Sequence, residues 1–312
     1  MRNTALTAVL LAALGASALT GCSGTSGTPG ADAGGATADG GPSADARGTA
    51  SGTPRADGPR AAPDAGNSPH SPGTSTSPGK ARWKPRPGLA WQWQLDGRAD
   101  PSADVPVYDI DGFENSAADV ARLHRDGRKV ICYVNVGAWE DFRPDKDAFP
   151  RSVLGRPNGW AGERWLDIRQ VSVLRPIMER RFDMCRDKGF DAVEPDLVEG
   201  YGNDTGFPLT ARDQLAYNRM IAAVAHQRGL SVGLKNDLPQ IPQLLADFDF
   251  AVNEECAQYD ECGRLAPFIA AGKAVFHVEY TEPRSSFCAE SRRLKLSSMV
   301  KEPELGVWRK PC

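Results

Sequence analysis

The stretch from residue 189 to residue 210 reads G-F-D-A-V-E-P-D-L-V-E-G-Y-G-N-D-T-G-F-P-L-T, and it decides how the rest of the chain is understood. It opens on Gly189, continues through a short apolar segment and places Glu194 and Asp196 two residues apart. Because successive side chains of a strand point to opposite faces, these two carboxylates share one face. Isolated buried charges carry a large free-energy penalty. The stretch therefore predicts a strand that ends at the open mouth of a barrel or a sheet crevice, or in a salt-bridged strand end without a chemical role.

The same order of elements recurs along the chain: a helix that ends on glycine, one or two linking residues, and a strand with a polar tip. Gly127 precedes K-V-I-C-Y-V-N, Gly229 precedes S-V-G-L-K-N, and Gly272 precedes A-V-F-H-V-E-Y. Further strands are predicted at residues 91–95, 105–111, 250–255 and, as the last strand, 305–310. Strands that alternate with helices favour a parallel sheet of the α/β class, and about eight of them favour closure into a (βα)8 TIM barrel. An open doubly wound sheet is the alternative, although no glycine-rich phosphate loop follows any strand.

Two of the intervening helices carry the start signal of a capping box. Ser116 is followed three residues later by Asp119, and Thr210 is followed three residues later by Asp213. In this arrangement the two side chains satisfy each other's free backbone amides at the first turn of a helix. We therefore expect helices to begin after Ser116 and after Thr210.

The first 80 residues predict two segments outside the folded domain. Residues 1–22 contain Arg2, an apolar run too short to span a membrane and the ending L-T-G-C. This pattern resembles a bacterial lipoprotein signal in which Cys22 is lipidated and becomes the new N-terminus, with an ordinary cleaved secretory signal as the alternative. Residues 23–80 almost lack large apolar side chains, which is typical of a disordered tether. We expect an exported protein, lipid-anchored on the extracellular face of the membrane or secreted, with one domain over residues 81–312.

The other six cysteines lie where disulfides persist if the chain is exported. Six cysteines allow fifteen pairings. Proximity in the sequence predicts Cys256–Cys262 and Cys288–Cys312, which leaves Cys132 with Cys185. The formal net charge of −3 and the lack of a basic tract with interleaved aromatic residues argue against nucleic acid as a partner. We expect a monomer.

Polar side chains gather at the predicted strand tips, which is where the active site of a barrel lies. The candidate residues are Trp93, Asp109, Asp111, Tyr133, Asn135, Glu194, Asp196, Tyr201, Lys235, Asn236, Asp237, Glu254, Glu255 and Glu279, with Trp139 and Tyr259 as further stacking aromatics. Together they predict an acidic pocket with one lysine. Two carboxylates that flank a sugar linkage, with aromatic platforms beside them, are the usual design of a glycosidase.

Other chemistries find less support in the sequence. The histidines lie far apart and neither H-x-x-x-H nor C-x-x-C occurs, which argues against zinc. Calcium at Asp109, Asp111 or Asp204 stays an open alternative, although D-x-D on a strand is not an EF-hand loop. No G-x-S-x-G turn is present for a Ser-His-Asp triad. We predict an enzyme without a metal or another cofactor.

Seven motifs together resemble the pattern of glycoside hydrolase family 114. They are W-Q-W-Q-L at Trp91, Y-D-I-D at Tyr108, V-E-P-D at Val193, T-G-F-P-L-T at Thr205, D-Q-L-A-Y-N at Asp213, G-L-K-N-D at Gly233 and V-N-E-E-C at Val252. The family comprises endo-α-1,4-polygalactosaminidases, (βα)8 enzymes that act on galactosamine-containing polysaccharides. The resemblance covers residues 83–312 and implies that Asp196, at the tip of the fourth strand, is the nucleophile. It further implies that Glu254, on the sixth strand, is the acid/base.

Two positions do not follow directly from this resemblance. Leu197 stands where the family pattern commonly has asparagine. We expect Phe250 and Val252 to face the helices. Because side chains alternate along a strand, Glu255 rather than Glu254 would then point into the barrel as the acid/base. Strand ends often bulge near active sites, so Glu254 remains the first candidate and Glu255 the second.

The resemblance implies a retaining reaction in which Asp196 attacks the anomeric carbon while Glu254 protonates the leaving oxygen. Lys235 would keep Asp196 ionised, because a nearby positive charge lowers the pKa of a carboxyl group. The remaining acids would pair with the ammonium groups of deacetylated galactosamine: Asp109, Asp111, Glu194, Asp237 and Glu279. The alternative is a lipid-anchored barrel that binds a polysaccharide without cleaving it.

Overall fold

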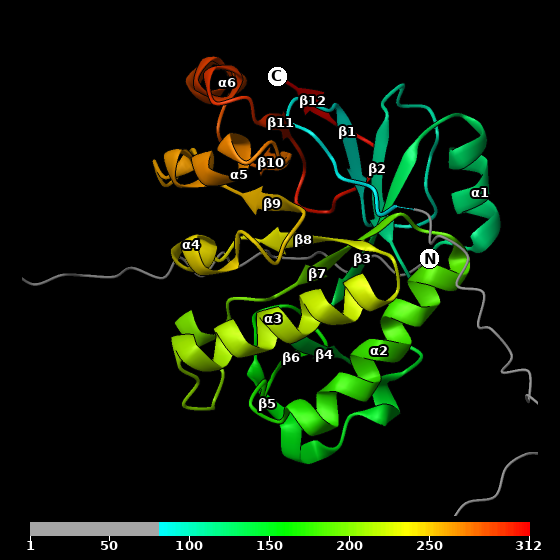
Figure 1. Ribbon diagram of the computed structural model, residues 1–312, viewed down its shortest axis with the longest axis vertical. Coiled ribbons are helices and arrows are strands. Elements are labelled where there is room, and N and C mark those ends of the chain that lie inside the picture. The colour runs from blue at the N-terminus through cyan, green and yellow to red at the C-terminus, as the bar shows by residue number, and fades with distance from the viewer. Residues whose placement is uncertain (1–80) are drawn as a thin grey trace, which may run out of the picture. The chain divides into compact units, whose positions relative to one another are not determined.

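The computed structural model describes residues 81–312 (Figure 1). The signal peptide predicted at residues 1–22, its lipidation site Cys22 and the tether predicted at residues 23–80 lie outside the described residues. Among the helices of residues 81–312, none is long and apolar enough to cross a membrane.

Residues 81–312 form one curved sheet of eight parallel strands with helices packed around it (Figure 1). In sheet order the strands are β1 (Trp91–Gln94), β2 (Val107–Asp111), β3 (Lys129–Asn135), β7 (Ala192–Asp196), β8 (Ser231–Lys235), β9 (Phe250–Glu254), β10 (Val275–Glu279) and β11 (Ser297–Val300). Trp91 Nε1 donates a hydrogen bond of 2.8 Å to the carbonyl of Ser297, which joins the first parallel strand to the last. Each strand lies beside the previous one, as in a (βα)8 barrel. The predicted TIM barrel is confirmed.

The helices form the outer layer of this barrel (Figure 1). They are α1 (Ala117–Arg125), α2 (Val171–Lys188), α3 (Ala211–Gln227), α4 (Ile241–Leu244), α5 (Ala266–Ala270) and α6 (Arg284–Arg293), with short 3-10 turns η1 (Lys146–Ala148), η2 (Arg151–Val153), η3 (Gly200–Gly202), η4 (Leu238–Gln240) and η5 (Cys262–Leu265). Both predicted capping boxes are present, Ser116 with Asp119 and Thr210 with Asp213. The start of each of these two helices is therefore confirmed.

The last parallel strand was predicted in the wrong place. The sequence pattern predicts it at residues 305–310, whereas the structure has β11 at Ser297–Val300 and a short antiparallel strand, β12 (Lys310–Pro311), beyond it. Strands β3, β7, β8 and β10 each follow a glycine with positive φ, but Lys295 takes this left-handed conformation before β11, with φ 59°. A prediction that requires a glycine before each strand therefore does not identify β11.

A small second sheet interrupts the alternation of strands and helices between β3 and α2. It contains β4 (Ala138–Glu140), β5 (Leu154–Pro157) and β6 (Glu163–Leu166), in the antiparallel order β4-β6-β5. No sequence pattern predicts it. Because it follows the carboxyl end of β3, it adds side chains at the end of the barrel where the predicted site lies.

The barrel interior corrects the predicted orientation of β9. Phe250 and Val252 belong to the interior cluster with Trp91 and Phe276, whereas Ala251 packs in the outer layer with the helices. The prediction assigned the two faces the other way. It was wrong because both faces of a parallel strand are apolar, so alternation of side chains does not tell them apart. Glu254, which shares the face of Phe250 and Val252, therefore points toward the interior.

The six cysteines of residues 81–312 form three disulfides with the predicted pairing: Cys132–Cys185, Cys256–Cys262 and Cys288–Cys312. The first joins strand β3 to helix α2. The second closes a short loop directly after β9, and the third joins helix α6 to the last residue of the chain.

Candidate active site

Lys235, the last residue of β8, lies at the centre of a cluster of carboxylates at the carboxyl end of the barrel. Its Nζ lies 2.8 Å from Asp196 Oδ1, 3.1 Å from Glu194 Oε1 and 3.3 Å from Glu254 Oε2. These acids stand on β7 and β9, the two strands that flank β8. The ammonium group also lies 4.9 Å from the centre of the Trp93 ring. One buried cation is thus shared by three carboxylates from neighbouring strands.

Asp196 at the tip of β7 is held as an anion. Tyr133 donates a hydrogen bond of 2.7 Å to Asp196 Oδ2, while Lys235 binds Oδ1. Burial alone would raise the pKa of Asp196, but the charge of Lys235 and the hydrogen bonds from Lys235 and Tyr133 lower it below its ordinary value. An ionised carboxylate whose side chain is 15% exposed is a suitable nucleophile.

A second pair of acids lies deeper in the barrel. Glu194 Oε2 accepts a hydrogen bond of 3.0 Å from Trp93 Nε1. Asp109 is fully buried and its oxygens have no hydrogen-bond donor among the described residues. Burial and the charge of Glu194 raise the pKa of Asp109 well above its usual range. The raised pKa favours the protonated, uncharged form of Asp109.

Glu254 at the tip of β9 is positioned from two sides. Tyr280 donates a hydrogen bond to its Oε1, and Asn236 Nδ2 donates to its Oε2 over 3.3 Å. The Asn236 side-chain oxygen in turn accepts a 3.0 Å hydrogen bond from the Glu254 amide. With 26% of its side chain exposed, Glu254 reaches open space at the mouth.

Asp237 and Tyr201 form the next contact along the rim. Asp237 accepts hydrogen bonds from the Tyr201 hydroxyl over 3.2 Å and from Asn218 Nδ2 over 3.0 Å. Burial raises the pKa of Asp237 to about 7, although these two hydrogen bonds oppose the rise. The predicted residues Tyr201, Asn236 and Asp237 thus lie in the loops that follow β7 and β8, beside the carboxylates of the cluster.

Three residues predicted for the site, Asp111, Asn135 and Glu279, have hydrogen-bond partners outside the lysine cluster. Asp111 pairs with Arg143 through both carboxylate oxygens, at 3.0 and 2.7 Å. Asn135 accepts the amides of residues 137 and 138, which fixes the turn after β3. Glu279 accepts from the Ala257 amide over 2.7 Å and lies 2.7 Å from His277 Nε2, in a buried network outside the lysine cluster. These buried side chains support the loops of the mouth, whereas the sequence predicts them as substrate-binding residues.

Glu255 and Trp139 lie outside the lysine cluster. Glu255 adopts φ 61° directly after β9, and it makes no ion pair with Lys235 in the described residues. Burial and the charge of Glu254 raise the pKa of Glu255 to about 7. Trp139 lies on the small second sheet and lines a hollow of about 370 Å³ with Arg151, Leu154 and Arg164.

Two acids near the mouth were not predicted. Glu199 lies three residues beyond Asp196, and burial together with the charge of Asp196 raises its pKa to about 8. Glu163, on β6, accepts a hydrogen bond of 2.8 Å from Asn158, and burial raises its pKa to about 7. Glu199 could have been predicted as a site residue from its position in the stretch 189–210, shortly after the tip of β7. Glu163 had none, because its place depends on the small second sheet.

The three aspartates that the sequence left open as calcium ligands, Asp109, Asp111 and Asp204, each have other neighbours in the structure. Asp111 binds Arg143, Asp204 binds Arg156, and Asp109 lies against Glu194 inside the barrel. The three acids thus have separate neighbours and do not form one set of ligands. A group formed by Cys256, Cys262 and His277 has metal-ligand spacing, but its two sulfur atoms are joined in a disulfide.

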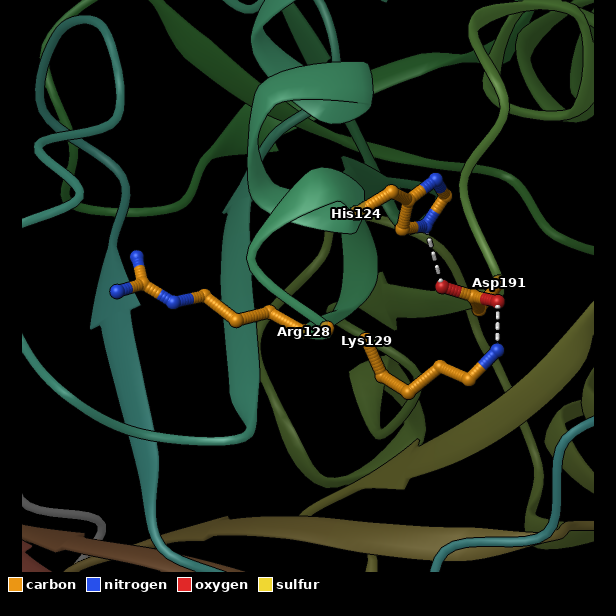
Figure 2. Close-up of a pocket in the computed structure, with 5 residues that line it drawn as sticks. His124, Arg128, Lys129 and Asp191 are labelled. Atoms are coloured by element: carbon orange, nitrogen blue, oxygen red, sulfur yellow. Dashed lines mark hydrogen bonds and ion pairs between the residues drawn. The ribbon is translucent and has the colours of Figure 1, made fainter.

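A hollow of about 350 Å³ lies at the opposite end of the strands (Figure 2). Lys129 begins β3 there, and Asp191 directly precedes β7. Asp191 Oδ1 lies 2.5 Å from Lys129 Nζ, and Oδ2 lies 2.8 Å from His124 Nε2 (Figure 2). These contacts join α1, β3 and the start of β7, which indicates a structural role for the charged residues.

Comparisons with known proteins agree with this geometry. Residues 73–312 match glycoside-hydrolase family GH114. The structure is similar to the crystal structure of Aspergillus fumigatus Ega3 in complex with galactosamine, with 41% identity over 75% of this chain and 98% of that chain and a TM-score of 0.71. It shares its fold with the glycoside hydrolase domain of PelA from Pseudomonas aeruginosa, at 16% identity over 70% of this chain and 97% of that chain, with a TM-score of 0.57. No curated protein sequence matches the chain. The extent of the family match and the similarity to Ega3 show that the chain belongs to glycoside hydrolase family GH114 and is an endo-acting glycosidase, as its seven motifs predicted.

Proposed function

We propose that the protein is an exported enzyme that cleaves α-1,4-linked galactosamine-containing polysaccharide by a two-carboxylate, retaining mechanism. The observation that carries this proposal is the position of Lys235 Nζ, within 3.3 Å of both Asp196 and Glu254. The ionised carboxylate of Asp196 and the carboxyl group of Glu254 therefore both lie beside one buried ammonium group.

In the first step, an oxygen of Asp196 forms a bond to the anomeric carbon. The bond from that carbon to the leaving oxygen breaks, and Glu254 transfers its proton to this oxygen. Lys235 and Tyr133 hold Asp196 ionised for the attack. The product is a glycosyl ester on Asp196 and a shortened polysaccharide chain.

In the second step, Glu254 takes a proton from a water molecule, whose oxygen attacks the same carbon. The ester bond to Asp196 breaks and the carboxylate is restored. Two inversions leave the configuration of the anomeric carbon unchanged. Tyr280 and Asn236 hold Glu254 in place for both proton transfers.

The separation of the two carboxyl groups supports the retaining outcome. Asp196 Oδ1 and Glu254 Oε2 both contact one nitrogen, so these two oxygens are at most about 6 Å apart. Retaining glycosidases hold their carboxyl groups roughly 5–5.5 Å apart, whereas inverting enzymes leave about 6.5–9.5 Å for a water molecule.

The charge of the mouth supports an amine-bearing substrate. Glu199, Asp237 and Glu254 lie around the space beside Asp196, and Lys235 is already shared by three carboxylates. Carboxyl groups in such a setting are stabilised as anions by an added cation. The ammonium groups of deacetylated galactosamine supply that cation, and the similar protein Ega3 was crystallised in complex with galactosamine.

Export is part of the proposal. The three disulfides are typical of proteins outside the reducing cytosol. The sequence L-T-G-C at residues 19–22 favours lipidation of Cys22, which would anchor the enzyme to the membrane surface. Residues 23–80 would then separate a monomeric barrel from the membrane.

The test is digestion of purified deacetylated, acetylated and neutral α-linked polymers by wild type and Asp196→Asn, with products identified by mass spectrometry. We expect short amino-sugar oligomers from the deacetylated polymer only, and a loss of turnover of at least about 10³-fold in Asp196→Asn without loss of binding. Asp204→Asn, which changes an exposed aspartate, is the matched control. Full activity of Asp196→Asn, or faster cleavage of a neutral glucan, would refute the proposal. Retention of polymer without any cleavage by wild type would instead support the binding-protein alternative.

A further inference from the structure

Glu199 lies at the mouth but has no part in the two-carboxylate mechanism. It stands in the loop between β7 and η3, where its carbonyl accepts hydrogen bonds from the Gly202 amide over 3.1 Å and from Asn203 Nδ2 over 3.3 Å. Its side-chain Oε2 is enclosed and has no hydrogen-bond partner in the described part of the chain. The backbone carbonyl of Glu199 is thus hydrogen-bonded while Oε2 of its carboxyl group has no partner among the described residues.

The groups that face Glu199 come from each element around the mouth. They are Asp196 on β7, Tyr201 on η3, Lys235 on β8, Asp237 after β8 and Glu254 on β9. Lys235 is the one cation of this set, and it lies at ion-pair distance from Glu194, Asp196 and Glu254 rather than from Glu199. Burial and the charge of Asp196 raise the pKa of Glu199 to about 8, so it holds a proton at neutral pH.

We propose that Glu199 determines specificity for amino sugars by exchanging its proton for the ammonium group of a bound galactosamine residue. This inference rests on the proposed function and names the residue that recognises the amino group of the sugar. The geometry behind it is an enclosed carboxyl oxygen that lacks a donor, three residues from the proposed nucleophile and faced by three other acids.

The exchange follows from charge balance. An ammonium group beside Glu199 favours the carboxylate, so the proton leaves to solvent as the sugar binds. The ammonium group then donates the hydrogen bond that Oε2 lacks. An acetamido group carries no charge, so it cannot bring about the ionisation. The site would therefore select the amine over the N-acetyl form by coupling binding to proton release.

Calorimetry tests this coupling directly. Free galactosamine and N-acetylgalactosamine are titrated into the protein, about two pH units below the pKa of Glu199, in two buffers with different ionisation enthalpies. We expect wild type to release about one more proton per bound galactosamine than Glu199→Gln. Galactosamine should bind about tenfold more weakly to Glu199→Gln, and N-acetylgalactosamine should bind both proteins equally. Glu199→Asp should recover part of the proton release.

Glu163→Gln is the matched control, because Glu163 also has a raised pKa but already accepts hydrogen bonds from Asn158 and Asn135. It should keep the preference for the amine. Thermal unfolding of each variant confirms that it is folded. Equal proton release and equal preference in wild type and Glu199→Gln would overturn the role of Glu199 while leaving the proposed function intact. A wild type that neither binds galactosamine nor cleaves its polymer would overturn both.

Discussion

Lys235 Nζ lies 2.8 Å from Asp196 Oδ1, and this contact explains how a buried aspartate remains ionised. Replacement of Lys235 with methionine keeps an unbranched side chain that is one atom shorter and removes the charge. Burial of Asp196 is then opposed by the Tyr133 hydrogen bond but no longer by the charge of Lys235, so the pKa of Asp196 should rise. We expect the acidic limb of the profile of kcat/KM against pH to move upward by about 1–3 pH units. Kinetics over a range of pH on deacetylated polymer measure this shift.

Lys129→Met is the control for this variant, since Lys129 pairs with Asp191 at the opposite end of the strands. It should leave the acidic limb where it is in wild type. An unchanged acidic limb in Lys235→Met would show that Lys235 does not set the ionisation of Asp196.

Glu254 and Glu255 are adjacent, so substitution of each separates their roles. Glu254→Gln should lower kcat by about 10²–10⁴-fold, because the leaving oxygen no longer receives a proton. An aryl galactosaminide with a good leaving group does not need that proton, so Glu254→Gln should largely retain the first step with it. Glu255→Gln should lose much less activity on either substrate. A larger loss in Glu255→Gln would transfer the acid/base role to Glu255.

Asp237 should make the barrel less stable as pH rises. Burial raises the pKa of Asp237 from 3.8 to about 7, so the folded state holds a proton that the unfolded state has lost between these two values. Stability from this group is fully present below the unfolded pKa and is lost as pH rises toward the folded one. Thermal unfolding of wild type and Asp237→Asn between these pH values should show a steeper decline for wild type. Parallel declines would contradict the raised pKa.

Leu197 occupies a backbone conformation that suits asparagine better. Its φ is 59°, in the left-handed region that carries a steric cost for most side chains. Its side chain belongs to none of the apolar clusters of the described residues, so little packing is lost on substitution. Leu197→Asn should raise the free energy of unfolding by about 1 kcal/mol and Tm by about 2–4 °C. Lys295→Asn, at φ 59°, should act in the same direction. A fall in Tm in both variants would contradict this account.

Much of the fold was predictable because it depends on local signals. Glycines at helix ends and the capping boxes at Ser116 and Thr210 mark boundaries within a few residues of chain. The alternation of these elements then implies a barrel. The eighth parallel strand was missed where Lys295 replaces glycine, and the small second sheet was missed because its strands are short and pair with each other.

The site was predictable to the extent that strand tips converge in a barrel. Asp196, Lys235 and Glu254 meet as expected. The direction of each side chain was harder to predict, since Asp111 and Glu279 are strand-tip acids whose partners, Arg143 and the Ala257 amide, come from loops. The strong rise in the pKa of Asp109 also depends on tertiary burial, which the sequence around it does not show.

The hydrogen bond from Trp91 to Ser297 has a consequence for the local opening of the barrel. Backbone pairing runs from β1 through β11 in sheet order, and in the described residues no strand ladder connects β11 back to β1. Amide hydrogens at this seam should therefore exchange with solvent faster than those in the middle of the sheet. Strands β7, β8 and β9, which carry Asp196, Lys235 and Glu254, lie in that middle. The barrel can thus fluctuate at its seam while the reacting groups keep their spacing.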